Sequence, residues 1–435
     1  MTWLAGPPWL FAVLAFVIGS VLGRFLNRCI DRFPRHEPLR DQLAALLHVS
    51  DAERRLRGAR SLKHRLPVIG WLLPGNPLAR SRRGENFRFA AVELLNGLLF
   101  AVLVWVEFPN GFVAGPPDPF AIDGLEFLAP ASGSLTLQLI RFGLHLVLVQ
   151  AVLVASVIDF DRMIIPDGST IPAMLLAIVV GTFAGGTWLV PVWYEDVGLM
   201  AMLDLGDGYG GGIEVPALLL EHPHLHGFLV SIVGLIVGGG IVWAVRLIGH
   251  WALGREAMGF GDVILMAMIG SVVGWQPVLV IFFLAPLSAV VVVLFATVAG
   301  TTREFPFGPW LSLATVLLLV FWQAIWPHAG KFFVMGRVLA LVGLSALILL
   351  AVFLRGWRML RGDERWYADA HDGWTSADQL AYQSGENTDA SPQSWRGRLD
   401  GEWPGIAAGR GSLGENRWRG LPAAGGGTRR LHRDR

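Results

Sequence analysis

The feature that most constrains this chain is a series of long, almost uninterrupted apolar runs. A helix needs about 20 mostly apolar residues to cross the hydrocarbon core of a bilayer. Nine stretches qualify or come close: 8–28, 88–107, 137–158, 170–187, 227–248, 262–274, 276–299, 308–326 and 335–355. The sixth is short and partly polar, so we expect a half-span or one arm of a helical hairpin there. The runs predict an all-α, polytopic transmembrane helical bundle of eight or nine spans.

The composition agrees with a membrane protein. Hydrophobic residues make up 53% of the 435 positions and charged residues only 16%, whereas soluble domains carry about 25% charged residues. The net charge of +1 gives no indication of a nucleic-acid partner. Lys and Arg are missing from residues 1–23, so we expect the first apolar run to be a retained span and not a cleaved signal peptide.

The charges of the connecting segments predict the orientation of the spans. Segment 31–87 carries 12 Lys and Arg residues, whereas segments 108–136 and 188–226 carry none. Because basic loops remain in the cytoplasm, segment 31–87 is expected there and the two acidic segments outside. With nine spans, the N-terminus then lies outside and the C-terminus in the cytoplasm.

The chain divides into three regions by composition. Residues 1–107 hold the first two spans and the basic segment between them, and residues 135–355 hold the remaining spans. Residues 356–435 are rich in Gly, Arg and Trp and lack a long apolar run, so we expect a disordered cytoplasmic tail.

Two further features favour structural over functional interpretations. Segment 188–226 is long, acidic and rich in glycine, and we expect a mobile insertion outside any active site. Near its end, His222, His224 and His226 are close enough in sequence for a metal, but an exposed, unstructured histidine cluster is the simpler interpretation.

Carboxylates at the ends of apolar runs are the strongest functional signal. Charge within a membrane segment is costly and usually functional. Asp159 lies where the third run ends, and Asp262 lies where the sixth begins, after Gly259 and Gly261. The loop charges put both aspartates at the cytoplasmic end of their spans. The simpler alternative for Asp159 and its neighbours Asp161 and Asp167 is an ordinary charged loop at the membrane surface.

Such a pair of aspartates has a known chemical use. Two carboxyl groups that flank one water can hydrolyse an amide, one ionised to take the proton and one protonated to polarise the carbonyl. Close, partly desolvated carboxyls share one proton. The glycines before Asp262 would let the backbone approach a neighbouring helix or an extended substrate.

These motifs resemble those of the prepilin peptidases, which are membrane aspartic proteases. One family motif is similar to Asp159 followed by Ile165-Pro166-Asp167-Gly168-Ser169-Thr170, and the other to the complete stretch from Glu256 to Val263. The resemblance implies that Asp159 and Asp262 are the catalytic pair, with Asp167 as the competitor of Asp159. The basic leader of a substrate is expected to be recognised electrostatically by acidic side chains near the pair, namely Asp161, Asp167 and Glu256.

Further stretches extend the resemblance over roughly residues 19–320. They are Gly19-Ser20, 23–34, His64 to Leu72, Phe89 to Leu95, and Pro306-Phe307-Gly308-Pro309. The resemblance implies an enzyme of the bacterial inner membrane whose substrates are type IV prepilin or pseudopilin precursors. It also implies a second activity, methylation of the new N-terminus with S-adenosylmethionine, in the region 1–107. Asn27 and Glu93 are the candidate contributors to that step.

Two departures from the family pattern affect these expectations. Many members carry two Cys-x-x-Cys pairs in the cytoplasmic loop, but Cys29 is the only cysteine of this chain. We therefore expect no zinc, and a small buried side chain at Cys29. Ile264 stands where many members have Lys, which removes a cation near Asp262.

Two functions from other classes remain as alternatives. A proton-coupled transporter would also hold paired membrane aspartates, but it predicts inverted repeats and polar residues near the midplane, whereas the sequence shows no repeat and its two carboxylates are expected at one membrane face. A non-catalytic membrane component of a pilus or type II secretion apparatus would tolerate the loss of either aspartate.

Overall fold

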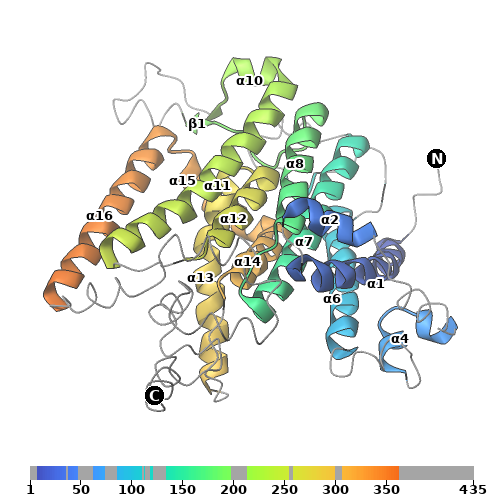
Figure 1. The fold of residues 1–435 in the computed structure, drawn as a ribbon. Coiled ribbons are helices and arrows are strands. Elements are labelled where there is room, and N and C mark those ends of the chain that lie inside the picture. Colours follow the sequence, from blue (N-terminus) through green and yellow to red (C-terminus); the bar gives the residue numbers. More distant parts are fainter. Residues whose placement is uncertain are drawn as a thin grey trace, which may run out of the picture. The chain divides into compact units, whose positions relative to one another are not determined.

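The structure is a computed structural model composed almost entirely of helices (Figure 1). It describes residues 7–35, 38–47, 62–73, 86–109, 112, 118–120, 134–196, 213–253, 258–298 and 306–361. The helices are α1 (Pro8–Arg32), η2 (Phe33–Arg35), α2 (Leu39–Leu47), η3 (Leu62–Arg65), α4 (Ile69–Leu72), α6 (Asn86–Glu107), α7 (Leu135–Arg162), α8 (Asp167–Ala184), α10 (Ala217–Glu221), α11 (Pro223–Leu253), α12 (Phe260–Val273), α13 (Trp275–Val298), α14 (Gly308–Val320), α15 (Trp322–Phe333) and α16 (Arg337–Arg361). Strands β1 (Glu195–Asp196) and β2 (Ile213–Glu214) pair antiparallel. The all-α prediction is confirmed.

The long helices coincide with the apolar runs. Within the described part of the chain, seven helices are long and apolar enough to cross a membrane: α1, α6, α7, α8, α11, α13 and α16. The pair α14 and α15 makes an eighth span only if a bend of 101° between them is accepted. The chain leaves helical geometry at Phe321, so the expectation of one continuous span over 308–326 was wrong. Helix α12 has 14 residues, and it is as short as expected.

The chain forms two compact units. One consists of Met1–Ala244 and Met258–Gly343, and the other of Val245–Ala257 and Leu344–Arg435. In the second unit, the guanidinium of Arg355 lies 5.3 Å from the ring centre of Trp251. Helix α16 continues to Arg361, and the rest of the expected tail lies outside the described residues. Both aspartates of interest belong to the first unit.

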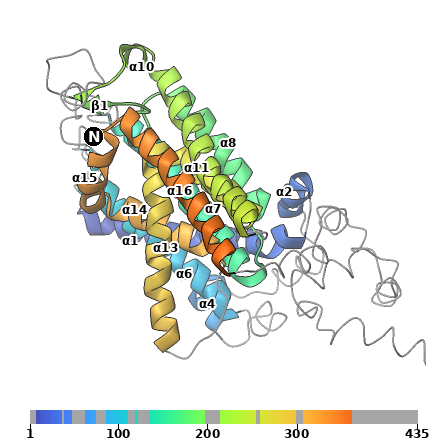
Figure 2. The same ribbon diagram turned by 90° about the vertical axis from the view of Figure 1, so that its left-hand side faces the viewer.

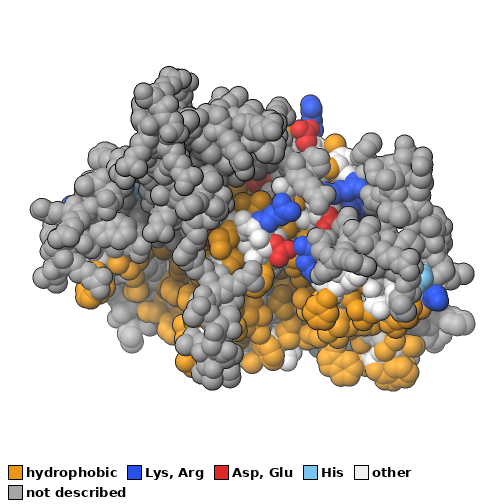
Figure 3. All heavy atoms as spheres, turned by 60° about the horizontal axis from the view of Figure 1, so that its bottom comes forward, with side chains coloured by type: hydrophobic (Ala, Val, Ile, Leu, Met, Phe, Trp, Pro, Cys, Tyr) orange, Lys and Arg blue, Asp and Glu red, His pale blue; other side chains and the backbone are white. Residues whose placement is uncertain are grey.

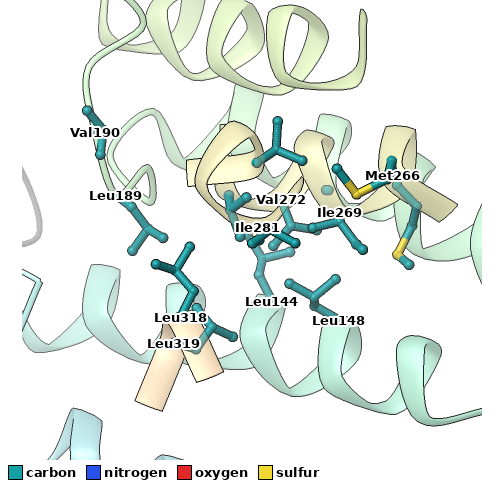
Figure 4. Close-up of a cluster of buried hydrophobic side chains, with 14 of the residues drawn as sticks. Leu144, Leu148, Leu189, Val190, Met266, Ile269, Val272, Ile281, Leu318 and Leu319 are labelled. Carbon is teal, nitrogen blue, oxygen red and sulfur yellow. The ribbon is translucent and has the colours of Figure 1, made fainter. Parts of the chain in front are cut away.

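The core of the first unit is formed by α7, α12, α13 and α14. Figure 4 shows side chains from all four helices pointing toward one another, among them Leu148, Ile269, Ile281 and Leu318. All four are fully buried. Core contacts of this kind hold α12 against α7 although the two helices are far apart in sequence, and they therefore determine where Asp262 lies relative to Asp159.

The segment after α8 contributes to this core. Leu189 and Val190 are buried there (Figure 4), and the indole of Trp275 donates to the carbonyl of Val192 at 2.5 Å. The ring of His226 is also buried and accepts a hydrogen bond from the Val192 amide at 3.0 Å. The expectation of an exposed cluster was therefore wrong for His226, because long-range packing buries it. Segment 188–196 thus packs into the core, and the glycine-rich part from which mobility was expected, within 197–212, lies outside the described residues.

Helices in this unit approach one another closely where glycines meet. The N-terminal part of α11 runs beside α8 in both ribbon views (Figure 1 and Figure 2). A Cβ on Gly227 of α11 would lie 2.0 Å from the carbonyl oxygen of Gly181 in α8. Small residues at such crossings let membrane helices pack backbone against backbone.

Buried polar pairs connect α7 with α6 and with Asp118 near one end of α7. Arg141 of α7 holds Asp118 with two hydrogen bonds of 2.8 and 2.5 Å. One turn along, His145 contacts Glu107 of α6 at 2.8 Å. All four side chains are buried. Because a charge removed from water needs a partner, these pairs determine how the connection between the helices can be arranged.

The surface combines charged and apolar areas. A space-filling view shows acidic and basic side chains beside one another in the middle of one face, with hydrophobic side chains spread below them (Figure 3). Large apolar side chains are exposed along the helices, for example Trp9, Val13 and Val17 of α1. Extended apolar surfaces of this kind suit contact with lipid.

Candidate active site

Asp159 lies in the last turn of α7. Its side chain is buried with the residue only 5% exposed, and Oδ2 accepts a hydrogen bond from the backbone amide of Gly308 at 3.2 Å. Helix α7 ends at Arg162, and the next residue, Met163, has a left-handed backbone with φ of 58°. The chain then runs extended to Pro166, the residue before α8. The short connection leaves the Asp159 side chain beside the beginning of α14.

Gly308 was not recognised as a site residue from the sequence. A Cβ at this position would lie 2.5 Å from Oδ2 of Asp159, so only glycine allows the amide to reach the carboxylate. Gly308 begins α14, and amides at the beginning of a helix have no partner within the helix and favour negative charge. The Pro306-Phe307-Gly308-Pro309 stretch was the available signal, because a glycine between prolines at a helix start suggests a close backbone contact.

Asp262 is the third residue of α12. It is buried, with 7% exposed, and helix α12 begins after the extended residue Gly259. A Cβ on Gly261 would lie 3.0 Å from the Cβ of Ile165. The beginning of α12 therefore packs tightly against the connection between α7 and α8, as expected for a glycine that allows close approach.

The two aspartates interact electrostatically. Burial, and second the charge of Asp159, raise the pKa of the Asp262 carboxyl above its ordinary value. Ile165 links the surroundings of the pair, because it borders both Gly261 and Gly308. Two carboxyl groups in this relation favour a state with one proton between them. That state can activate water and polarise a carbonyl.

The other acidic candidates have different surroundings. Asp167 is partly exposed at the first position of α8, and the carboxylate that acts on Asp262 is Asp159 and not Asp167. Asp161 is paired with Arg88 at 2.6 Å, so its charge is balanced by a residue of the protein. Glu256 lies outside the described residues.

The candidates for methylation form internal contacts. Glu93 of α6 is fully buried, and its two oxygens accept hydrogen bonds from the Val68 amide and the Trp71 indole, each at 2.6 Å. Val68 has a positive φ of 59°, which is strained for a β-branched residue. The Asn27 amide donates to the carbonyl of Phe89 at 3.0 Å. Glu93 therefore joins the segment 62–73 to α6, and Asn27 joins α1 to α6.

Cys29 is buried as a free thiol, which confirms the expectation of a buried small side chain. Among the described residues, no group of three or more His, Cys, Asp or Glu side chains is arranged to hold a metal ion. The absence of zinc remains a prediction, because much of the basic segment lies outside those residues.

Two family models match the chain. The model described as "Bacterial Peptidase A24 N-terminal domain" matches residues 17–107, which include Asn27 and Glu93. The model described as "Type IV leader peptidase family" matches residues 215–294, which include Asp262. Asp159 lies between the two matched ranges.

Curated relatives are similar over most of the chain. A "Prepilin leader peptidase/N-methyltransferase" of Stutzerimonas stutzeri is 25% identical over 344 residues, which cover 74% of this chain and 94% of that protein. The protein of the same name from Pseudomonas aeruginosa is 23% identical, covering 75% and 95%. A "Type 4 prepilin-like proteins leader peptide-processing enzyme" of Escherichia coli is 26% identical, covering 71% and 93%. No solved structure matches the chain.

Proposed function

The chain belongs to the prepilin peptidase family, and from this membership we propose that it removes leader peptides from type IV prepilin-like precursors. The observation that carries the proposal is the buried pair of Asp159 and Asp262, in which one carboxylate acts on the other. Curated relatives of the chain are named as leader peptidases or as a leader peptide-processing enzyme. The chain is a multi-pass membrane protein whose partners are prepilin substrates and the lipid bilayer.

In the mechanism that we propose, Asp159 is the ionised member of the pair. The Gly308 amide donates to its carboxylate, which favours the charged form. Asp262, with its raised pKa, keeps the shared proton. Asp159 then takes a proton from water as the water attacks the scissile carbonyl, and Asp262 polarises that carbonyl. The proton on Asp159 passes to the leaving nitrogen as the amide bond breaks.

We propose that this reaction takes place at the cytoplasmic face of the bacterial inner membrane. The basic segment 31–87 supports this orientation, because Lys and Arg retain loops in the cytoplasm. The N-terminus then lies outside, and an odd number of crossings after it leaves the C-terminus inside. A substrate whose basic leader remains in the cytoplasm and whose apolar helix enters the bilayer presents its scissile bond at this depth.

We further propose that the protein methylates the new N-terminus with S-adenosylmethionine, in line with the names of its relatives. When bound, this cofactor supplies an electrophilic methyl group. Glu93 does not fit as its direct ligand, because it is fully buried and both of its carboxylate oxygens accept hydrogen bonds within the protein. Asn27 is also buried, and its amide nitrogen donates to the carbonyl of Phe89. The role of Asn27 and Glu93 is to hold α1, α6 and the segment 62–73 together, and we assign no step to them.

The test is cleavage of a model prepilin by purified protein in detergent. Asp159→Asn and Asp262→Asn should each abolish cleavage without loss of folding, because an amide can neither take nor share the proton. Glu221→Gln, an exposed change at the end of α10, is the matched control. Activity in Asp159→Asn together with inactivity in Asp167→Asn would transfer the role to Asp167. Full activity in both single variants would remove both aspartates from the reaction, whereas absence of cleavage by the wild type would favour a transporter or a non-catalytic component.

Mass spectrometry of the products of this reaction tests the methylation step. Products formed with and without S-adenosylmethionine should differ by one methyl group on the mature N-terminus. Identical masses would remove the methylation step from the proposal and leave the peptidase step intact.

A further inference from the structure

The connection between α7 and α8 is held at both ends by the N-terminal region of the chain. This connection, residues 161–168, follows Asp159 directly and includes Asp167. In its middle, Met163 and Ile164 are 61% and 43% exposed, and Ile165 packs against Gly261 and Gly308. The contacts at the two ends add to that packing in determining how the connection lies.

The first contact is an ion pair at the end of α7. The guanidinium of Arg88, at the beginning of α6, contacts Asp161 at 2.6 Å and Asp31 of α1 at 3.1 Å. One cation thus joins the ends of three helices, α1, α6 and α7. Asp161 is two positions after Asp159, so this pair restrains the helix turn that carries the Asp159 carboxylate.

The second contact is a hydrogen bond at the beginning of α8. The amide of Gly168 donates to Oε1 of Gln42 in α2 at 2.8 Å, and Gln42 is 5% exposed. A Cβ on Gly168 would lie 2.6 Å from that oxygen and 3.0 Å from the ring of Phe33, so α2 and the end of α1 fit against this glycine. Arg32 donates to the carbonyl of Ala45, which anchors α2 to α1.

We infer that Gln42 and Arg88 are positioning residues for the peptidase reaction, because they clamp both ends of the connection that follows Asp159. The inference rests on the proposed function and extends it. The region that family resemblance connects with methylation is then also required for proper cleavage. Neither residue touches the reacting groups. Each acts through the backbone of the α7–α8 connection.

Positioning and simple stabilisation predict different kinetics. A contact that only stabilises the fold lowers the fraction of active protein and lowers the melting temperature with it. A contact that orients Asp159 lowers kcat in folded protein and leaves KM nearly unchanged, because the substrate still binds. A misplacement of 1 Å at reacting groups can reduce the rate about 100-fold, so a partial release should reduce kcat about tenfold.

The experiment measures kcat and KM for cleavage of a model prepilin by the full chain in detergent, together with the melting temperature. Gln42→Leu should lower kcat about tenfold. Gln42→Glu should remain near the wild type, because a carboxylate also accepts from the Gly168 amide and is favoured at a helix N-terminus. Arg40→Leu, on the exposed side of the same helix, is the matched control and should have no effect.

The ion pair provides an independent test with partly exposed residues, for which folding should persist. Arg88→Met and Asp161→Asn should each lower kcat, and the double variant should be no worse than Arg88→Met, because that change already breaks the contact with Asp161. Additive losses, or equal kcat in Gln42→Leu and Arg40→Leu, would overturn the inference while leaving the peptidase function in place. Absence of cleavage by the wild type would overturn both.

Discussion

The crossing of α11 and α12 provides a stringent test of how the fold positions Asp262. A Cβ added to Gly270 of α12 would lie 2.0 Å from the carbonyl oxygen of Gly234 in α11, about 1.4 Å short of the 3.4 Å at which ordinary contact begins. Backbone atoms cannot rotate away as a side chain can. Gly270→Ala must therefore push the two helices apart by an amount of this order.

The expected magnitude has two parts. Overpacking of a close crossing costs about 1 to 3 kcal/mol of unfolding free energy. Gly270 lies eight positions after Asp262, which is about 12 Å along the helix axis. Because the buried α12 moves largely as a rigid element, a displacement near 1 Å reaches Asp262 and should lower cleavage by up to about 100-fold.

The assay compares thermal unfolding and prepilin cleavage of purified variants in detergent. Gly240→Ala is the matched control on α11, because no atom lies within 4 Å of its added Cβ. Alanine is the better helix former by up to about 1 kcal/mol, so this control should be equal to or more stable than the wild type. If Gly270→Ala behaves like Gly240→Ala in both measurements, the close crossing does not position α12 and the reasoning fails.

Two other features lead to predictions of their own. Arg141→Met leaves Asp118 buried without its cation and should lower the unfolding free energy by about 3 to 5 kcal/mol; adding Asp118→Asn should recover much of the loss, and no recovery would contradict the ion-pair explanation. Cleavage should follow a bell-shaped pH profile. Burial and the Asp159 charge raise the pKa of Asp262, so the alkaline limb of the profile should lie above the ordinary pKa range of a carboxyl group. A decline completed at the pKa of a free aspartate would contradict this assignment of the proton.

Much of the helical architecture could be predicted because a bilayer leaves the chain few choices. A spanning segment must satisfy its own backbone hydrogen bonds, and a helix does so within one apolar run. The limits of α6 and α7 therefore differ by only a few residues from the runs 88–107 and 137–158. The hydropathy of a run indicates how long an apolar segment is but not whether its helix axis changes direction. For this reason the bend at Phe321 was not predicted.

The candidate site could likewise be predicted only in part from the sequence. Asp159 and Asp262 could be selected from the sequence because charge at the end of an apolar run is costly. Their role as the catalytic pair stays a prediction, and burial and second the charge of Asp159 raise the pKa of Asp262. Gly308, whose amide donates a hydrogen bond to Asp159, could not be predicted, because the two residues are 149 positions apart in the sequence. The burial of His226 was missed for a similar reason, since its partner Val192 is 34 positions away.

The bond between Gly308 and Asp159 also has a consequence for the order in which the protein is made. Ribosomes add about 5 to 20 residues per second, so Asp159 emerges on the order of ten seconds before Gly308. During that interval the nascent chain holds the Asp159 carboxylate but lacks the Gly308 amide that donates a hydrogen bond to it. The catalytic centre is therefore completed late in synthesis, after most of the chain has been made, and a product that ends between Asp262 and Gly308 would carry both aspartates without this amide.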